Sequence, residues 1–150
     1  MTVARFWREQ KNRYNLLGTK CGNCGKIFFP PKEICSDCHR KSIGKMEVVK
    51  LGGGGTVVSY SIIHEAPEAF KDQVPYHLAI IELEEGPKIT AQIVDVPQVS
   101  DEKTTAESEE PHITLDIGSR VTSVFRKISE DGKSGIIHYG YKFKLVPEKC

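Results

Sequence analysis

The stretch that decides the fold is CGNCGKIFFPPKEICSDCH at residues 21–39, which holds four of the chain's five cysteines. The cysteines form two Cys-x-x-Cys pairs. Such a turn points two sulfurs at one centre and leaves backbone N–H groups free to bond them. Two turns supply the four soft ligands of a tetrahedral metal site. We therefore predict one metal site at Cys21, Cys24, Cys35 and Cys38.

Three other kinds of site use cysteines in a similar pattern. Residues 35–39 also satisfy the c-type haem attachment pattern, but that chemistry belongs to exported proteins and gives the first pair no role. A thioredoxin-like dithiol needs one pair at the start of a helix in a βαβ setting, which the flanking prolines and the second pair contradict. Iron in a rubredoxin-like site stays open, and zinc is favoured because nothing else suggests electron transfer. We expect His39 to be a neighbour of the site and Cys150 to be a free thiol.

The residues before the cysteines predict a helix at 2–17, with Thr2 as its cap and Gly18 just past its end. The cysteine module then spans about residues 19–47. It ends before a run of four glycines, which cannot cheaply hold a helix or a strand. We predict an N-terminal helix and zinc ribbon at 1–51, a glycine hinge at 52–55 and a second domain at 56–150.

The second domain reads as short β-rich runs separated by turn signals. The runs span residues 56–64, 76–84, 88–94, 113–115, 121–128 and 135–145. Turn signals at 85–87 and 130–133 separate neighbouring runs, and residues 97–111 are acidic with little to bury, which indicates a surface loop. The chain is therefore expected to be mainly β, with an N-terminal helical segment and a small barrel.

The last run alternates apolar with polar or basic residues, and we expect its apolar face to lie in the barrel core. The apolar face is Ile137, Tyr139, Tyr141, Phe143 and Leu145.

Composition and charge restrict the classes of protein to which the chain can belong. No apolar run approaches the roughly 20 residues needed to cross a bilayer, and the N-terminus lacks the apolar region of a secretory signal. We expect a cytoplasmic protein with reduced cysteines. Residues 1–50 hold 11 Lys and Arg against 4 Asp and Glu, so the head carries +7 and the remaining residues carry −6.

No residue pattern argues for catalysis. His64, His77, His112 and His138 are scattered, and the chain has neither a Gly-x-Ser-x-Gly nor a His-Glu-x-x-His motif. The glycine run lacks the Gly-Lys-Ser/Thr ending of a phosphate loop. We expect a protein that is not an enzyme by itself.

The order of helix, two-knuckle ribbon, glycine hinge and small barrel resembles the zinc-ribbon/OB-fold family known as domain of unknown function thirty-five. The resemblance covers nearly the whole chain. Its landmarks are Phe6-Trp7, the two Cys-x-x-Cys pairs with Phe28-x-Pro30, the run from Pro75-Tyr76 to Glu85-Gly86, and Ile117-Gly118-x-x-Val121. It implies a rubredoxin-like zinc ribbon followed by a five-stranded OB-fold barrel.

The resemblance also implies a function. Members of the family are thought to be non-catalytic acyl-CoA-binding partners of thiolase-like enzymes, including the pairing of acetoacetyl-CoA thiolase with hydroxymethylglutaryl-CoA synthase. Coenzyme A is a polyanion with a long pantetheine arm, which suits basic residues beside apolar ones. The candidate ligand-binding residues are Trp7, Arg8, Lys11, Arg13, Lys20, Lys26, Phe28 and Phe29.

Two rival functions stay open. Ribbons and OB-folds also hold nucleic acid through basic grooves and stacking aromatics, although that predicts a basic barrel. Alternatively, the chain is a structural adaptor that docks on a larger enzyme through Trp7 and the leading helix without binding CoA.

Overall fold

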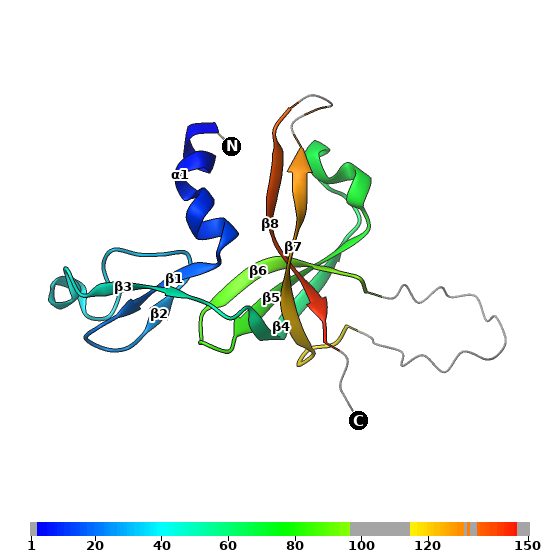
Figure 1. Ribbon diagram of the computed structural model, residues 1–150. Coiled ribbons are helices and arrows are strands. Elements are labelled where there is room, and N and C mark those ends of the chain that lie inside the picture. The colour runs from blue at the N-terminus through cyan, green and yellow to red at the C-terminus, as the bar shows by residue number, and fades with distance from the viewer. Residues whose placement is uncertain (1–2, 97–114, 131, 133–134, 147–150) are drawn as a thin grey trace.

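The computed structural model describes residues 3–96, 115–130, 132 and 135–146. These residues form one short α-helix, a three-stranded sheet and a closed five-stranded barrel, in that order (Figure 1). This arrangement confirms the predicted order of helix, ribbon and small barrel. Within the described ranges, the helices are all too short or too polar to cross a lipid bilayer.

The helix α1 spans Val3–Tyr14 and ends three residues earlier than predicted. Leu16 adopts a left-handed backbone with φ of 47°, and Leu17 already begins a strand. Gly18 therefore does not end the helix. It lies where a Cβ atom would come within 2.7 Å of the Phe28 carbonyl oxygen, so a close approach of two strands requires glycine. The predicted cap, Thr2, lies outside the described residues.

The ribbon sheet was not resolved into strands from the sequence, because its strands are very short. Its strands are β1 at Leu17–Cys21, β2 at Ile27–Phe28 and β3 at Met46–Lys50. They pair antiparallel in the order β2-β1-β3. The 3-10 helix η1, His39–Ser42, precedes β3. The strands hold the first cysteine pair in the turn between β1 and β2.

The barrel joins five strands in the order β4-β5-β6-β8-β7. All neighbours are antiparallel except β6 and β8, which run parallel and pair at only two positions, Ile93 with Phe143 and Val94 with Lys144. The 3-10 helix η2, Glu68–Gln73, connects the first two strands. The strands are β4 at Gly54–Ile63, β5 at Tyr76–Leu83, β6 at Lys88–Val94, β7 at Arg120–Glu130 and β8 at Ile137–Leu145.

Most predicted strands form, with β6 at its predicted bounds. Both predicted turns are present: Gly86 has a φ of 102°, and β7 and β8 pair as an antiparallel hairpin around Gly132. The strand expected at 113–115 is not formed at Leu115, and its other two residues lie outside the described ranges, as does the loop expected at 97–111.

The prediction that the four glycines hold neither a helix nor a strand is wrong in part, since Gly54 and Gly55 belong to β4. A Cβ atom on Gly55 would lie 2.6 Å from the Glu82 carbonyl oxygen on β5. Glycine at this position therefore permits close strand pairing. The part of the predicted hinge that precedes β4, and the domain limits, remain predictions.

The predicted alternation of β8 holds at its C-terminal end but fails before it. Phe143 and Leu145 are buried as expected, whereas Ile137 and Tyr139 are exposed and Lys142 is buried. The β7–β8 hairpin extends beyond the barrel, so its inner face loses the opposite wall (Figure 1). On the outer face of the hairpin, Lys142 lies against η2 and donates a hydrogen bond to the side chain of Gln73.

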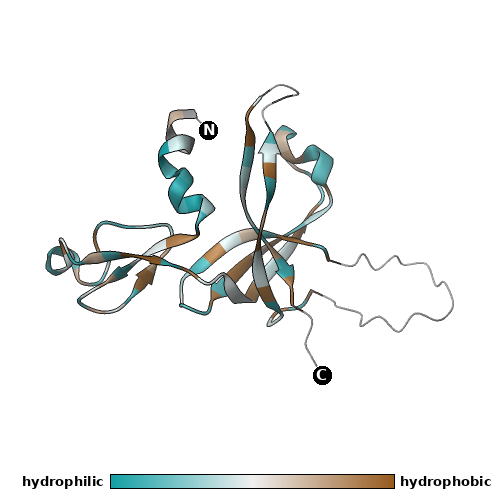
Figure 2. Cartoon of the chain, viewed as in Figure 1, coloured by the Kyte–Doolittle hydropathy of each residue, from teal (hydrophilic) through white to brown (hydrophobic). Residues whose placement is uncertain are grey.

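One hydrophobic core links the N-terminal segment to the barrel. Leu16 and Leu51 are 3% and 2% exposed and pack with the buried barrel side chains. The Leu51 N–H donates to the Leu16 carbonyl at 3.0 Å, and the Tyr141 hydroxyl donates to the Tyr14 carbonyl. Hydrophobic residues alternate with hydrophilic ones along the barrel strands (Figure 2). The buried barrel side chains are Val57, Ala79, Ile81, Leu83, Ile89, Ile93, Leu115, Val121, Phe143 and Leu145.

Candidate functional site

The four predicted cysteines meet at one point of the ribbon. The Sγ atoms of Cys21, Cys24, Cys35 and Cys38 all lie within 4.8 Å of one another, and those of Cys24 and Cys35 are 3.6 Å apart. Tetrahedral zinc with Zn–S bonds of about 2.3 Å separates its sulfurs by about 3.8 Å. The cluster therefore fits a four-coordinate metal ion with only small adjustment.

The two cysteine turns have the same backbone geometry. The Gly25 N–H donates to the Cys21 carbonyl at 2.8 Å, and the His39 N–H donates to the Cys35 carbonyl at 3.0 Å. The residue after the second cysteine is left-handed in both turns, with φ of 77° at Gly25 and 47° at His39. His39 therefore shapes the backbone of the second turn. Among the described residues, the cluster of potential metal ligands consists of the four cysteines and does not include the His39 imidazole.

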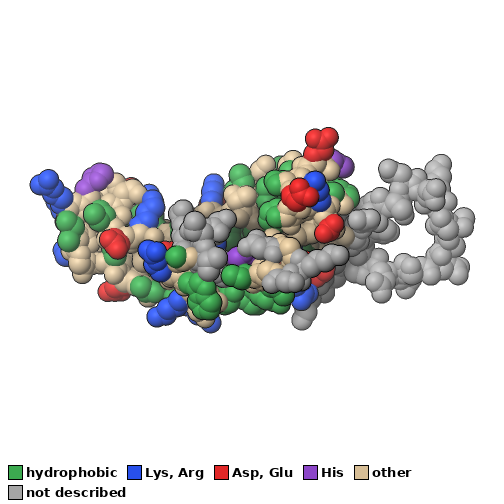
Figure 3. Space-filling view, turned by 90° about the horizontal axis from the view of Figure 1, so that it is seen from above, with side chains coloured by type: hydrophobic (Ala, Val, Ile, Leu, Met, Phe, Trp, Pro, Cys, Tyr) green, Lys and Arg blue, Asp and Glu red, His purple; other side chains and the backbone are tan. Residues whose placement is uncertain are grey.

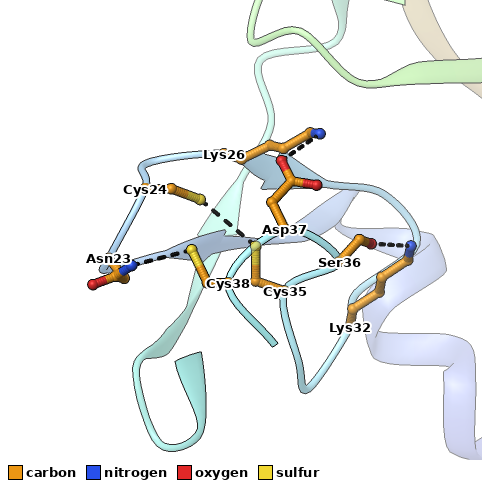
Figure 4. A network of polar contacts seen from close by, with 8 residues as sticks. All are labelled: Asn23, Cys24, Lys26, Lys32, Cys35, Ser36, Asp37 and Cys38. Atoms are coloured by element: carbon orange, nitrogen blue, oxygen red, sulfur yellow. Dashed lines mark hydrogen bonds and ion pairs between the residues drawn. The ribbon is translucent and has the colours of Figure 1, made fainter. Parts of the chain in front are cut away.

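Polar contacts hold the two turns together (Figure 4). Asn23 Nδ2 donates to Cys38 Sγ at 3.1 Å, and Lys26 Nζ pairs with Asp37 Oδ2 at 2.8 Å, each contact joining one turn to the other. The buried Ser42 hydroxyl accepts from the Cys35 N–H at 2.9 Å and donates to the His39 carbonyl at 2.6 Å. These contacts orient the sulfurs before any metal binds.

The thiols differ in acidity although they share one site. A backbone hydrogen bond from Cys24, with a smaller one from Asn23, lowers the pKa of Cys21 to about 7. At Cys24 a backbone hydrogen bond with Lys26 favours the thiolate, but burial and hydrogen bonds with the other cysteines raise the pKa to about 12. Four thiolates this close repel one another, so a divalent cation is needed to hold them all deprotonated.

A second feature adjoins the ribbon: a mainly apolar cavity of about 380 Å³ between the end of α1 and the barrel. Arg13 and Leu16 contribute from the N-terminal segment, and Phe29 contributes from the ribbon. The barrel side comes from η2, β6, β7 and β8, including Phe70, Ile128, Tyr139 and Tyr141. The cavity lies where three parts of the fold meet.

The structure brings two of the candidate ligand-binding residues together, Arg13 and Phe29, which both line this cavity. Trp7 is 65% exposed on α1, which also carries the exposed Arg8 and Lys11. The other three lie on the ribbon away from the cavity wall. Lys20 is exposed, Lys26 pairs with Asp37, and Phe28 is buried against Cys21 and Cys35.

Sequence reasoning missed the barrel half of the cavity. Phe70 lies in η2, where the sequence predicts no helix or strand, and Ile128 lies on a predicted strand with no predicted role in a site. The sequence predicts that Tyr139 and Tyr141 lie on the core-facing side of β8. The alternation of apolar and polar residues along this strand was the signal that could have placed both tyrosines at the cavity. His138 also lines the cavity, whereas His112 lies outside the described residues.

The charge asymmetry of the sequence is visible on the surface. In the view of Figure 3, Lys and Arg side chains gather over the ribbon side, and acidic side chains gather over the barrel side. On the described barrel surface that faces the viewer in Figure 3, basic side chains do not form the continuous groove that is typical of nucleic-acid binding.

Two family descriptions match successive parts of the chain. Residues 8–44 match the ChsH2 rubredoxin-like zinc ribbon domain, and residues 48–126 match the ChsH2 C-terminal OB-fold domain. The first match covers β1, β2 and all four cysteines of the ribbon, and the second covers the barrel from β4 into β7; β8 at Ile137–Leu145 lies beyond it.

Known relatives extend the match over the whole chain. A DUF35 domain-containing scaffold protein of Methanocaldococcus jannaschii is 49% identical over 144 residues, covering 96% of this chain and 91% of the relative. A probable enoyl-CoA hydratase alpha subunit of Thermomonospora curvata is 30% identical over 92 residues, which is 61% of this chain and 27% of that protein. The solved structure titled Ltp2-ChsH2(DUF35) aldolase shares the fold, with a TM-score of 0.60 at 22% identity and coverage of 97% of this chain and 96% of that one.

Proposed function

Since the chain belongs to the DUF35 family of ChsH2-type zinc-ribbon and OB-fold proteins, we propose that it is a non-catalytic accessory protein that binds acyl-CoA and associates with a thiolase-like enzyme. Close relatives are named scaffold proteins. A more distant relative is named as a subunit of an enzyme of enoyl-CoA, and a protein of the same fold occurs in an aldolase with Ltp2. These names support an enzyme partner and a CoA thioester ligand.

The cavity at the junction of α1, ribbon and barrel is the observation that carries the proposal. Its walls are mostly apolar, which suits a neutral pantetheine arm or an acyl group. Arg13 is part of the same wall, and α1 also carries the exposed basic residues Arg8 and Lys11. Phosphates of a CoA molecule would pair with these side chains while its arm enters the cavity.

The ribbon supports this site by position and does no chemistry itself. We propose that Cys21, Cys24, Cys35 and Cys38 hold one zinc ion. Zinc fixes the ribbon so that Phe29 stays at the cavity wall. Elemental analysis of the purified protein should find one zinc per chain, and one iron per chain would overturn this assignment. The same proposal places the protein in the cytoplasm, where thiols stay reduced.

Calorimetric titration of the full chain with acetyl-CoA tests ligand binding. We expect a saturable heat that Arg13→Gln weakens about tenfold, because a charge-assisted hydrogen bond to phosphate contributes about 1.5–3 kcal/mol. Arg40→Gln is the matched control, since Arg40 is an exposed arginine of the ribbon that does not line the cavity. No heat with acetyl-CoA, or equal losses in both variants, would contradict the proposal.

Two further measurements separate the rival functions. Light scattering of a mixture with a purified thiolase should show a complex larger than either protein, and two unchanged species would refute the partner. A mixed single-stranded oligonucleotide should bind weakly or not at all. Strong, salt-sensitive binding of the oligonucleotide without acetyl-CoA binding would favour a nucleic-acid module.

A further inference from the structure

Lys142 is a buried lysine without a carboxylate partner in the described part of the chain. It is 7% exposed and lies on β8 between Tyr141 and Phe143. Lysine is rarely buried unless it is paired. Lys144, two residues further along the same strand, is exposed as expected for a lysine on this face. The burial of Lys142 therefore needs an explanation.

The contacts of Lys142 leave part of its hydrogen-bonding capacity unused. Its Nζ donates to Gln73 Oε1 at 3.0 Å, and Gln73 Nε2 donates to the Ile128 carbonyl at 2.9 Å. The second bond fixes the Gln73 amide with its oxygen toward the lysine. An ammonium has three N–H donors, and the described residues accept one of them. Burial lowers the pKa of Lys142, a cost that a neighbouring anion would offset.

A cavity of about 210 Å³ lies beside this lysine. It lies beside the short contact between β6 and β8, which pair only at residues 93–94 and 143–144. The residues just before this contact on both strands form part of the wall, and η2, β5 and β7 supply the rest. Most of the wall is apolar, with a few polar side chains. The wall residues are Phe70, Tyr76, Leu78, Thr90, Ala91, Gln92, Ile128, Tyr141 and Lys142.

We propose that this smaller cavity, the Lys142 cavity, binds a small aliphatic carboxylate. The carboxylate group would accept the free N–H groups of Lys142, and the hydrocarbon chain would lie against Phe70, Leu78 and Ile128. An anion would offset the cost of burying the charged amine, and the apolar walls favour an aliphatic acid over inorganic phosphate. The Lys142 cavity shares part of its wall with the larger cavity, namely Phe70, Thr90, Ala91, Ile128 and Tyr141, so the two proposed sites are neighbours. The carboxylate proposal does not require CoA binding, because a free carboxylic acid needs no nucleotide.

Titration of the isotope-labelled full chain with butyrate, in the absence of any CoA compound, tests the proposal. We expect saturable shifts of the Gln73 side-chain amide resonances. Lys142→Met should weaken butyrate binding about tenfold or more, because it removes a charged hydrogen bond. Lys144→Met is the matched control and should leave binding unchanged. Equal weakening in both variants, or no saturable shift, would overturn the proposal.

Two measurements keep the test decisive even if Lys142→Met is poorly folded. Butyramide has the shape of butyrate without its charge, and in the unmodified chain it should bind at least about tenfold more weakly. The Lys142 side-chain resonances, followed against pH, should show a higher pKa when butyrate is bound. Equal binding of the two compounds, or an unchanged Lys142 pKa, would refute a carboxylate site.

Discussion

At the residue scale, left-handed backbone conformations decide local geometry at the metal centre and at the junction with the barrel. Gly25 and His39 take this conformation after the second cysteine of each turn, and Leu16 takes it where α1 gives way to β1. Glycine adopts it at no cost, whereas a residue with a Cβ atom loses about 1–2 kcal/mol. His39 and Leu16 are thus held in place by their surroundings.

His39→Gly tests whether His39 serves only the backbone. Glycine relieves the left-handed strain, so we expect one bound metal per chain and unchanged or slightly higher stability, by up to about 1 kcal/mol. Elemental analysis after dialysis measures the metal content, with Cys38→Ser as the control that should lose metal. Loss of metal from His39→Gly would identify the imidazole as a ligand.

Gly55→Ala tests the close approach of β4 and β5. The new methyl group would lie 2.6 Å from the Glu82 carbonyl oxygen and 2.8 Å from Ile81 Cγ2, so strands must separate. We expect a loss of about 1–3 kcal/mol in the free energy of unfolding, measured by urea denaturation. Gly52→Ala would contact only the Glu85 carboxylate at 3.2 Å and should cost less than about 1 kcal/mol. Equal losses would show that the strand contact is not the cause.

At the element scale, we expect the ribbon to depend on a bound metal more strongly than the barrel does. The ribbon has a small core of its own at Cys21, Phe28 and Cys35, and several of its other apolar side chains pack on the barrel core; the barrel has a large apolar cluster and paired strands all round. A unit with so small a core of its own is expected to need metal–sulfur bonds for much of its stability.

Chelation should therefore unfold the ribbon and spare most of the barrel. Site-resolved hydrogen exchange with and without a chelator measures this, with loss of protection expected in β1–β3 and retention in β5. Exchange rates of the β4 residues nearest the ribbon, measured in the same experiment, show how far the loss of protection spreads into the barrel. Loss of protection throughout the barrel would show that the metal stabilises the whole chain.

Acid should release the metal, because protons compete for the thiolates. Without metal, the pKa of Cys21 is about 7 and that of Cys24 is about 12, so lowering the pH below 7 protonates sulfurs that the metal needs. Metal affinity should fall about tenfold or more per pH unit, since each ion displaces at least one proton. A metal-indicator titration between pH 8 and 5 measures this, and a flat profile would exclude thiolate ligands.

The sequence was most informative where one local pattern decides an element, and least informative where distant parts meet. The spacing of Cys21, Cys24, Cys35 and Cys38 was enough to predict the cluster, because both turns are local. The helix end was missed because Leu17 and Gly18 are drawn into pairing with β3, which is remote in sequence. The burial of Lys142 was missed for the same kind of reason, since it depends on η2.

At the scale of the whole molecule, the N-terminal segment and the barrel stabilise each other. Leu16 and Leu51 flank the ribbon in sequence but belong to the barrel core. The cavity with Arg13 and Phe29 exists only because these units are packed together.

Leu16→Ala should destabilise the barrel although residue 16 precedes it. We expect a loss of about 2–5 kcal/mol in the free energy of unfolding, from lost burial and the cavity left behind. Thermal unfolding, followed by the NMR signals of barrel residues, measures this loss of stability. Val48→Ala, at a 67% exposed position of β3, should change stability by less than about 1 kcal/mol. Equal effects would show that Leu16 is not part of the shared core.

The two-residue contact between β6 and β8 also bears on the order of folding. The β4–β5–β6 meander and the β7–β8 hairpin each form from neighbouring segments, whereas Ile93 and Phe143 are far apart in sequence. Local pairings form fast and distant ones late. The seam that closes the barrel is therefore expected to be absent from the folding transition state, so that weakening it accelerates unfolding and leaves the refolding rate almost unchanged.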